Sequence, residues 1–172
     1  DGVYTNLFVA GKDIEPIVEN PKIKAVTLTG SEPAGASIAT AAAKLVKKST
    51  LELGGSDPFI VLEDADVQLA VKTAVQGRMA NGGQVCTSPK RIIVASRIYE
   101  EFLAKTKEAF AQIKVGNPMD SDTTLGPLST EKAAEDVLAQ IQKAAEQGAT
   151  IELGGKRIDR VGAFLEPTLI TD

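Results

Sequence analysis

Two residues of this sequence have the chemistry and the setting of catalytic groups, and the first is the only cysteine. Cys86 follows a glycine-containing segment and precedes Thr87, Ser88 and Pro89. In such an irregular loop, backbone N–H groups can face a bound substrate. A thiolate is a strong nucleophile, and Lys90 and Arg91 are close enough in sequence to favour it. An isolated cysteine is also common as a small buried hydrophobe, so the residues alone leave both interpretations open.

The second candidate is Glu52, which lies between two leucines and directly before Gly54 and Gly55. This pattern predicts a carboxylate in an apolar strand rather than on a solvated face. Such an environment suits a base that works near neutral pH. The alternative is a glutamate at a strand end whose neighbours happen to be apolar, and composition does not separate the two.

Residue counts remove most other chemistries. The 172 residues include one cysteine and no histidine. An internal disulfide, a multi-cysteine zinc site, a Ser-His-Asp triad and a Cys-His pair are therefore excluded within this chain, and we expect no metal site. The net charge of −4 comes without a dense Lys/Arg cluster, which argues against nucleic acid or an anionic membrane as partners. With 43% hydrophobic residues and no long apolar run, the chain is expected to fold as a soluble cytoplasmic protein.

A third feature is a strand-to-helix turn at Thr29, Gly30 and Ser31. The apolar run 25–28 predicts a strand, and the alanine-rich run 33–48 predicts a helix that Lys44, Lys47 and Lys48 complement at its end. The N–H groups at such a helix start attract phosphate, and Gly35 follows one turn later. The motif is neither GxGxxG nor a P-loop, so by itself it is weak and a purely structural turn is the default interpretation.

The rest of the chain alternates between strand and helix patterns. Apolar runs predict a buried strand over 58–62, further strands over 91–95, 150–153 and 167–170, and extended structure over 50–55. Helical spacing predicts helices from a cap at Asp64 to about 80, over 99–113 and over 130–147, and residues 81–86 are expected to form a loop. This alternation predicts an α/β fold with largely parallel pairing.

Taken in order, these segments resemble the aldehyde dehydrogenase superfamily. Thr29-Gly30-Ser31 is similar to its coenzyme-binding turn, Leu51-Glu52-Leu53-Gly54-Gly55 to its glutamate signature, and Gly83-Gln84-Val85-Cys86 to its cysteine signature. Cys86 follows Glu52 by 34 residues, as in that family. Three later segments, at 116–118, 125–127 and 166–168, also resemble family landmarks. The cysteine signature followed by Lys90-Arg91 is most similar to bacterial NAD(P)-dependent succinate-semialdehyde dehydrogenases. Some of these enzymes place a substrate-binding arginine where this chain has Ala80, with Arg78 nearby.

The resemblance implies a fold, a reaction and a set of site residues. Residues 1–53 would be the C-terminal part of a Rossmann-like NAD(P)-binding domain, and residues 54–172 most of a three-layer α/β/α catalytic domain. Cys86 would form a thiohemiacetal and then a thioester, which Glu52 would hydrolyse by activating water. The implied coenzyme, NAD or NADP, would contact these residues: Thr29, Gly30, Ser31, Gly35, Leu53 and Gly54.

The resemblance also leaves alternatives. Members of the family are much longer than this chain, so we expect it to be part of an oxidoreductase that works as a homo-oligomer, and to be inactive alone. One alternative is a folded but inactive piece that serves only as a structural module. Another is a CoA-acylating aldehyde dehydrogenase, which keeps the cysteine but usually lacks the glutamate, so Glu52 argues against it.

Overall fold

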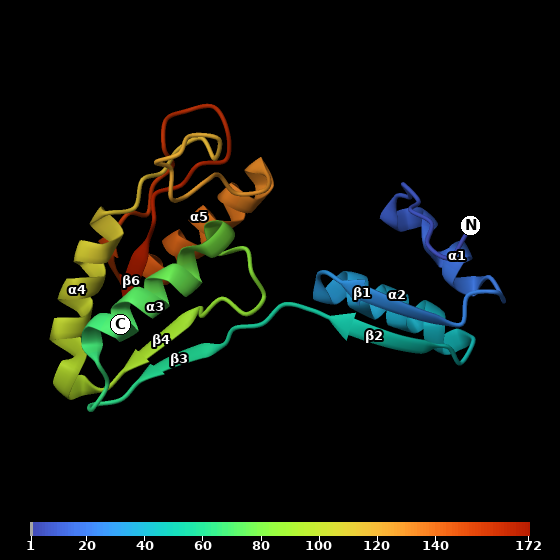
Figure 1. Cartoon of the computed structure of the whole chain (residues 1–172), viewed down its shortest axis with the longest axis horizontal. Coiled ribbons are helices and arrows are strands. Elements are labelled where there is room, and N and C mark those ends of the chain that lie inside the picture. Colours follow the sequence, from blue (N-terminus) through green and yellow to red (C-terminus); the bar gives the residue numbers. More distant parts are fainter. Residues whose placement is uncertain (1) are drawn as a thin grey trace. The chain divides into compact units, whose positions relative to one another are not determined.

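The computed structural model describes residues 2–172, which fold into two compact units that meet between Gly55 and Ser56 along the chain (Figure 1). Each unit contains strands covered by helices, which confirms the predicted α/β class.

The first unit is a pair of parallel strands covered by one long helix. Strand β1 pairs with β2 so that Thr29 lies opposite Glu52. The α1 and α2 helices share a small core with β1, built on Val18, Ala41 and Ala42. The elements of this unit are η1 (Gly11–Asp13), α1 (Glu15–Glu19), β1 (Ala25–Thr29), α2 (Glu32–Lys44) and β2 (Lys48–Glu52).

Helix α2 begins where the sequence predicts and ends earlier. The Ser31 side chain caps its first turn by accepting from the Ala34 N–H. At the other end the N–H of Lys47 bonds to the Ala42 carbonyl and the N–H of Val46 to the Ala43 carbonyl. This pair of bonds is a Schellman motif, which needs a left-handed residue, here Val46 at φ 54°. The prediction of a helix to residue 48 is therefore wrong by one turn, and Lys48 opens β2 instead.

The second unit is built around a parallel pair, β3 and β4, joined through α3. Helices α3 and α4 cover one face of this pair (Figure 1), with a core of Val61, Val71, Ala74 and Phe102.

The opposite face of the β3–β4 pair is open: Ile60 and its register partner Ile93 are exposed. The sequence predicts a fully buried strand at 58–62, which is wrong for this face. The elements are β3 (Pro58–Val61), α3 (Val67–Met79), η2 (Ala80–Gly83), β4 (Arg91–Val94), η3 (Ser96–Ile98), α4 (Tyr99–Ala111), α5 (Glu131–Glu146), β5 (Thr150–Leu153) and β6 (Leu169–Thr171).

Capping side chains set where two of these helices begin. The Asp66 carboxylate accepts from the Leu69 N–H at 3.0 Å, so α3 is capped by Asp66 and not by Asp64 as predicted. The hydroxyl of Thr130 accepts from the Ala133 N–H at 3.0 Å and starts α5 at the predicted position.

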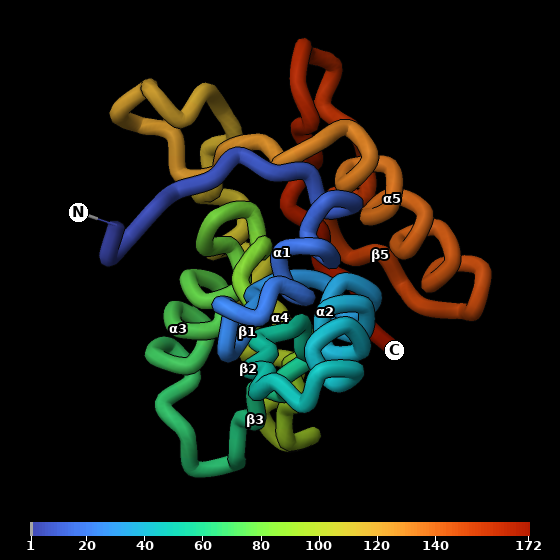
Figure 2. Tube along the Cα trace, turned by 90° about the vertical axis from the view of Figure 1, so that its right-hand side faces the viewer, coloured from blue at the N-terminus to red at the C-terminus, as the bar shows by residue number. Residues whose placement is uncertain are grey.

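The C-terminal part of the second unit departs from the predicted parallel pairing. Strands β5 and β6 are antiparallel. Helix α5, orange in Figure 2, is tied to the segment after β5 by an ion pair between Glu131 and Arg157. Hydrogen bonds from Lys107 and Thr171 hold the pKa of the Glu152 carboxyl below its ordinary value, so one carboxylate joins α4, β5 and β6.

We predict that Val46→Gly stabilises the protein. A left-handed conformation costs an L-residue about 1–2 kcal/mol, which glycine would avoid. Glycine also makes the unfolded chain more flexible, which lowers the free energy of unfolding by roughly 0.4–1 kcal/mol. The free energy of unfolding in urea should therefore rise by about 0.5–1 kcal/mol. Val161→Gly is the matched control, because Val161 is 99% exposed and lacks a positive φ. An equal or lower stability for Val46→Gly than for the unchanged protein would contradict the prediction.

Candidate active site

The cysteine loop starts with a sharp reversal after α3. Asn81, Gly82 and Gly83 all have positive φ, at 51°, 66° and 76°. Three consecutive left-handed residues end any regular helix and turn the chain back. This confirms the predicted loop, and Cys86 is exposed on it.

Two contacts anchor this loop to helix α3. The hydroxyl of Ser88, only 2% exposed, donates to the carbonyl of Gly77 at 2.6 Å. The guanidinium of Arg78 donates to the carbonyl of Gly83 at 3.3 Å. The φ of 76° at Gly83 favours glycine, and a Cβ there would also lie 3.0 Å from the Arg78 carbonyl oxygen. Burial lowers the pKa of the Arg78 guanidinium.

Gln84 ties the loop to a distant part of the same unit. Its Oε1 accepts from the Ser129 N–H at 2.8 Å, and its Nε2 donates to the Asn81 carbonyl at 2.9 Å. The sequence marks Gln84 only as part of the cysteine signature. Its role as a clamp depends on a partner 45 residues away, which no local pattern reveals.

The two cations expected to favour a thiolate are engaged with backbone carbonyls. The Lys90 ammonium donates to the carbonyls of Val85, Cys86 and Ser88 at 3.3, 3.0 and 3.1 Å. The Arg91 guanidinium donates to the Ser56 carbonyl at 2.8 and 3.0 Å. Both side chains therefore hold the backbone around the loop, a role that no local sequence pattern indicates.

Glu52 lies in the first unit, at the end of β2. It is exposed there, so the predicted apolar surroundings are not found within this unit. Its carbonyl accepts from the Gly30 N–H at 3.0 Å. Since β1 and β2 are parallel, this bond joins the turn after one strand to the end of the other.

The residues expected to bind coenzyme gather at this same end of the first unit. Thr29 and Gly30 close β1, Ser31 caps α2, and Leu53 and Gly54 follow β2. Gly35 is buried and its N–H bonds to the Ser31 carbonyl at 2.9 Å. A Cβ there would meet the Leu53 side chain at 2.8 Å. The structure therefore gives Gly35 a packing role, letting α2 approach the end of β2.

An apolar pocket of about 510 Å³ opens beside this turn, within the first unit. Its walls include Leu28 from β1 and Ala34, Ser37 and Ile38 from α2. An apolar pocket beside a helix start suits a ligand that combines a planar heterocycle with phosphates. These residues therefore fit a dinucleotide.

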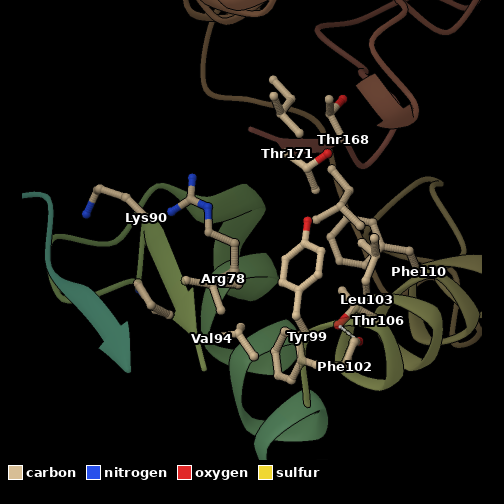
Figure 3. Close-up of a pocket in the computed structure, with 14 residues that line it drawn as sticks. Arg78, Lys90, Val94, Tyr99, Phe102, Leu103, Thr106, Phe110, Thr168 and Thr171 are labelled. Carbon is tan, nitrogen blue, oxygen red and sulfur yellow. Dashed lines mark hydrogen bonds between the residues drawn. The ribbon is translucent and has the colours of Figure 1, made fainter. Parts of the chain in front are cut away.

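The second unit has a pocket of its own, of about 270 Å³, next to α4 (Figure 3). Arg78 and Tyr99 extend into it, and the Tyr99 hydroxyl points toward the strand that carries Thr171 (Figure 3). Most of its lining is aliphatic or aromatic, including Phe102, Leu103 and Phe110.

Metal ligands and membrane-spanning helices are two further features to consider for residues 2–172. Within that range no group of three His, Cys, Asp or Glu side chains could hold a metal ion. None of the helices described there is long and apolar enough to span a bilayer.

Comparison with known proteins gives one consistent family. A profile described as the aldehyde dehydrogenase family matches residues 1–172. The chain belongs to the aldehyde dehydrogenase family. This confirms the resemblance carried by the glutamate and cysteine signatures.

Individual relatives of this aldehyde dehydrogenase chain cover it almost completely. The succinate-semialdehyde dehydrogenase [NADP(+)] of Deinococcus radiodurans is 48% identical over 171 residues, which are 99% of this chain and 36% of the relative. The succinate-semialdehyde dehydrogenase [NADP(+)] 1 of Mycobacterium tuberculosis H37Rv is 49% identical over 172 residues, 100% of this chain and 38% of the relative. The chain thus spans little more than a third of the length of the curated relatives it matches.

Solved structures agree with this family. The structure reported for cofactor and substrate selection by Gox0499 is 50% identical and superposes with a TM-score of 0.95, covering 97% of this chain and 37% of that one. Lactaldehyde dehydrogenase from Escherichia coli is 41% identical with a TM-score of 0.87, covering 91% of this chain and 33% of that one.

We predict that Ser88→Ala loosens the cysteine loop of this aldehyde dehydrogenase chain. The variant removes the buried bond to the Gly77 carbonyl, so the free energy of unfolding in urea should fall by about 1 kcal/mol. Thr87→Ala is the control, because the Thr87 side chain is exposed and should change stability by less than about 0.5 kcal/mol. Equal effects of the two substitutions would show that the Ser88 hydroxyl does not anchor the loop.

Proposed function

We propose that the enzyme containing this chain oxidises an aldehyde to the carboxylic acid with NAD or NADP as coenzyme. The observation that carries the proposal is family membership over residues 1–172. Cys86 and Glu52, each within its family signature, would supply the thiol nucleophile and the carboxylate base that this reaction needs. In this proposal the first unit is the end of the coenzyme domain, and the second is most of the catalytic domain.

Cys86 is the proposed nucleophile. Its sulfur attacks the aldehyde carbon, and the resulting thiohemiacetal carries a negative oxygen that needs hydrogen-bond donors. The Cys86 N–H is suited to be one donor, because no acceptor within residues 2–172 takes its proton. After hydride loss, the substrate carbon remains bound to Cys86 as a thioester.

Glu52 is the proposed base of the second half of the cycle. Its carboxylate takes a proton from water as the water oxygen attacks the thioester, and the acid then leaves the sulfur. The first unit presents Glu52 exposed at the end of β2, where its carboxylate is open to water.

The proposed coenzyme residues are the group at the end of β1 and β2. Gly30 and Ser31 at the start of α2 would hold phosphate, and the apolar pocket beside them would hold a planar ring. Thr29, Leu53 and Gly54 would line the approach, while Gly35 keeps α2 packed on Leu53. When bound, the nicotinamide coenzyme accepts the hydride.

The proposed substrate is succinate semialdehyde. This finer assignment rests on the names of relatives such as those from Deinococcus radiodurans and Mycobacterium tuberculosis, which also favour NADP. A homo-oligomeric assembly and a cytoplasmic location are further predictions from the sequence.

Substitution of the two catalytic candidates in the full-length enzyme tests the proposed reaction. Cys86→Ala should abolish aldehyde oxidation, because no thiohemiacetal can form. Glu52→Gln should lower steady-state turnover by about 10²–10⁴-fold, the range for loss of a general base. A pre-steady-state burst of reduced coenzyme should persist in Glu52→Gln, since only thioester hydrolysis is impaired. Normal turnover by either variant would overturn the assignment.

A matched pair of aldehydes tests the proposed substrate. Butanal has the same number of carbons as succinate semialdehyde but lacks its carboxylate. If the carboxylate is bound by a cation, kcat/KM should favour succinate semialdehyde by at least about 30-fold, equivalent to roughly 2 kcal/mol. Both aldehydes are measured with NAD and with NADP. Equal kcat/KM values would reject succinate semialdehyde while leaving aldehyde oxidation itself intact.

A further inference from the structure

The ammonium group of Lys90 is committed to the backbone of the cysteine loop. It lies within hydrogen-bond distance of three carbonyl oxygens, those of Val85, Cys86 and Ser88, at 3.3, 3.0 and 3.1 Å. A lysine ammonium has three protons to donate, so these contacts use its whole capacity. Hydrogen bonds from a charged donor are stronger than neutral ones, and the three together fix the carbonyl directions on both sides of Cys86.

One of these carbonyls controls the direction of the Cys86 N–H. The carbonyl of Val85 and the N–H of Cys86 belong to one peptide unit, which is planar and trans, so the two bonds point in opposite directions. The Val85 carbonyl accepts from the Ser88 N–H at 3.1 Å as well as from Lys90. Two donors on one side of the peptide therefore aim the Cys86 N–H to the other side, away from the Lys90 ammonium.

We propose that Lys90 is a positioning residue that aims the Cys86 N–H at the oxyanion formed when Cys86 attacks a carbonyl. This inference rests on the proposed function, which makes Cys86 the nucleophile and its N–H an oxyanion donor. Donors for an oxyanion are effective when they are held in place before the reaction, because no energy is then spent on turning them. Lys90 supplies this restraint through the backbone and does not itself touch the substrate.

Two electrophiles that both react with Cys86 can separate this role from a simple effect of charge on the thiol. With 4-nitrophenyl acetate, the thiolate forms a C–S bond to the acetyl carbon, the carbonyl electron pair moves onto oxygen, and collapse of that oxyanion expels 4-nitrophenolate. With iodoacetamide, the thiolate displaces iodide and no oxyanion forms. An oxyanion donor therefore matters to the first reaction only. Neither reaction requires coenzyme.

The experiment compares Lys90→Met with Lys72→Met in the full-length enzyme. Methionine keeps a long side chain but removes the charge and all three donors. Lys72 is exposed on α3 and controls for loss of one positive charge from the second unit. The burst rate of 4-nitrophenolate and the pH profile of alkylation by iodoacetamide are measured for both variants, after circular dichroism has shown that they are folded.

We expect Lys90→Met to slow the 4-nitrophenolate burst about 10-fold or more, since outright loss of an oxyanion donor costs about 10²–10³. Its alkylation rate and the midpoint of the pH profile should stay close to those of Lys72→Met. A burst rate equal to that of Lys72→Met would overturn the proposal. So would an equal fall in both reactions with an alkylation profile moved to higher pH, which would mean that Lys90 acts on the thiol through its charge. If Cys86→Ala keeps its activity toward aldehydes, the proposed function fails, whatever Lys90→Met shows.

Discussion

The parallel pairing of β3 with β4 is the constraint on which the second unit depends. Parallel neighbours cannot be joined by a tight turn, so the chain must cross over through a helix and return to the starting edge. Helix α3 makes this crossing, and its apolar face closes the core on Val61 and Phe102. The chain then has only residues 80–90 in which to reverse direction and enter β4. The cysteine loop is this return segment.

A return segment of this kind has no regular hydrogen bonds of its own, so side chains must replace them. Ser88 and Arg78 bond it to α3, Gln84 to the segment before α5, and Lys90 to its own carbonyls. The result is an irregular backbone with a fixed shape that leaves one exposed thiol. Rigid support around an exposed nucleophile is what a reaction at that thiol requires.

Local sequence patterns predict most of the helices and strands, because the residues that form each element lie next to the residues that end it. Thr130 caps α5, and an apolar stripe carries the helix through to its end. The signal is weaker where two residues compete: Asp64 and Asp66 are equally able to cap, and the structure selects Asp66. The early end of α2 was missed because valine is a poor residue for the left-handed position that Val46 occupies.

Burial and hydrogen bonds between distant segments could not be predicted from the sequence patterns. The exposure of Glu52 and of Ile60 depends on which segments pack over each strand. The order of apolar and polar residues along a strand does not contain that information. The sequence signatures select Cys86 and Glu52 as catalytic candidates by residue type and spacing. The contacts of Lys90 and Gln84 could not be predicted in the same way, because their partners are backbone atoms whose positions only the fold determines.

The left-handed run at Asn81, Gly82 and Gly83 also limits which substitutions the cysteine loop accepts. Both glycines have backbone angles that most other residues adopt only with strain, and a side chain at Gly83 would also crowd the Arg78 carbonyl. Substitutions at these two glycines are therefore expected to destabilise the second unit. Thr87 is exposed and directly follows the thiol, so diversity introduced there is far better tolerated by the scaffold.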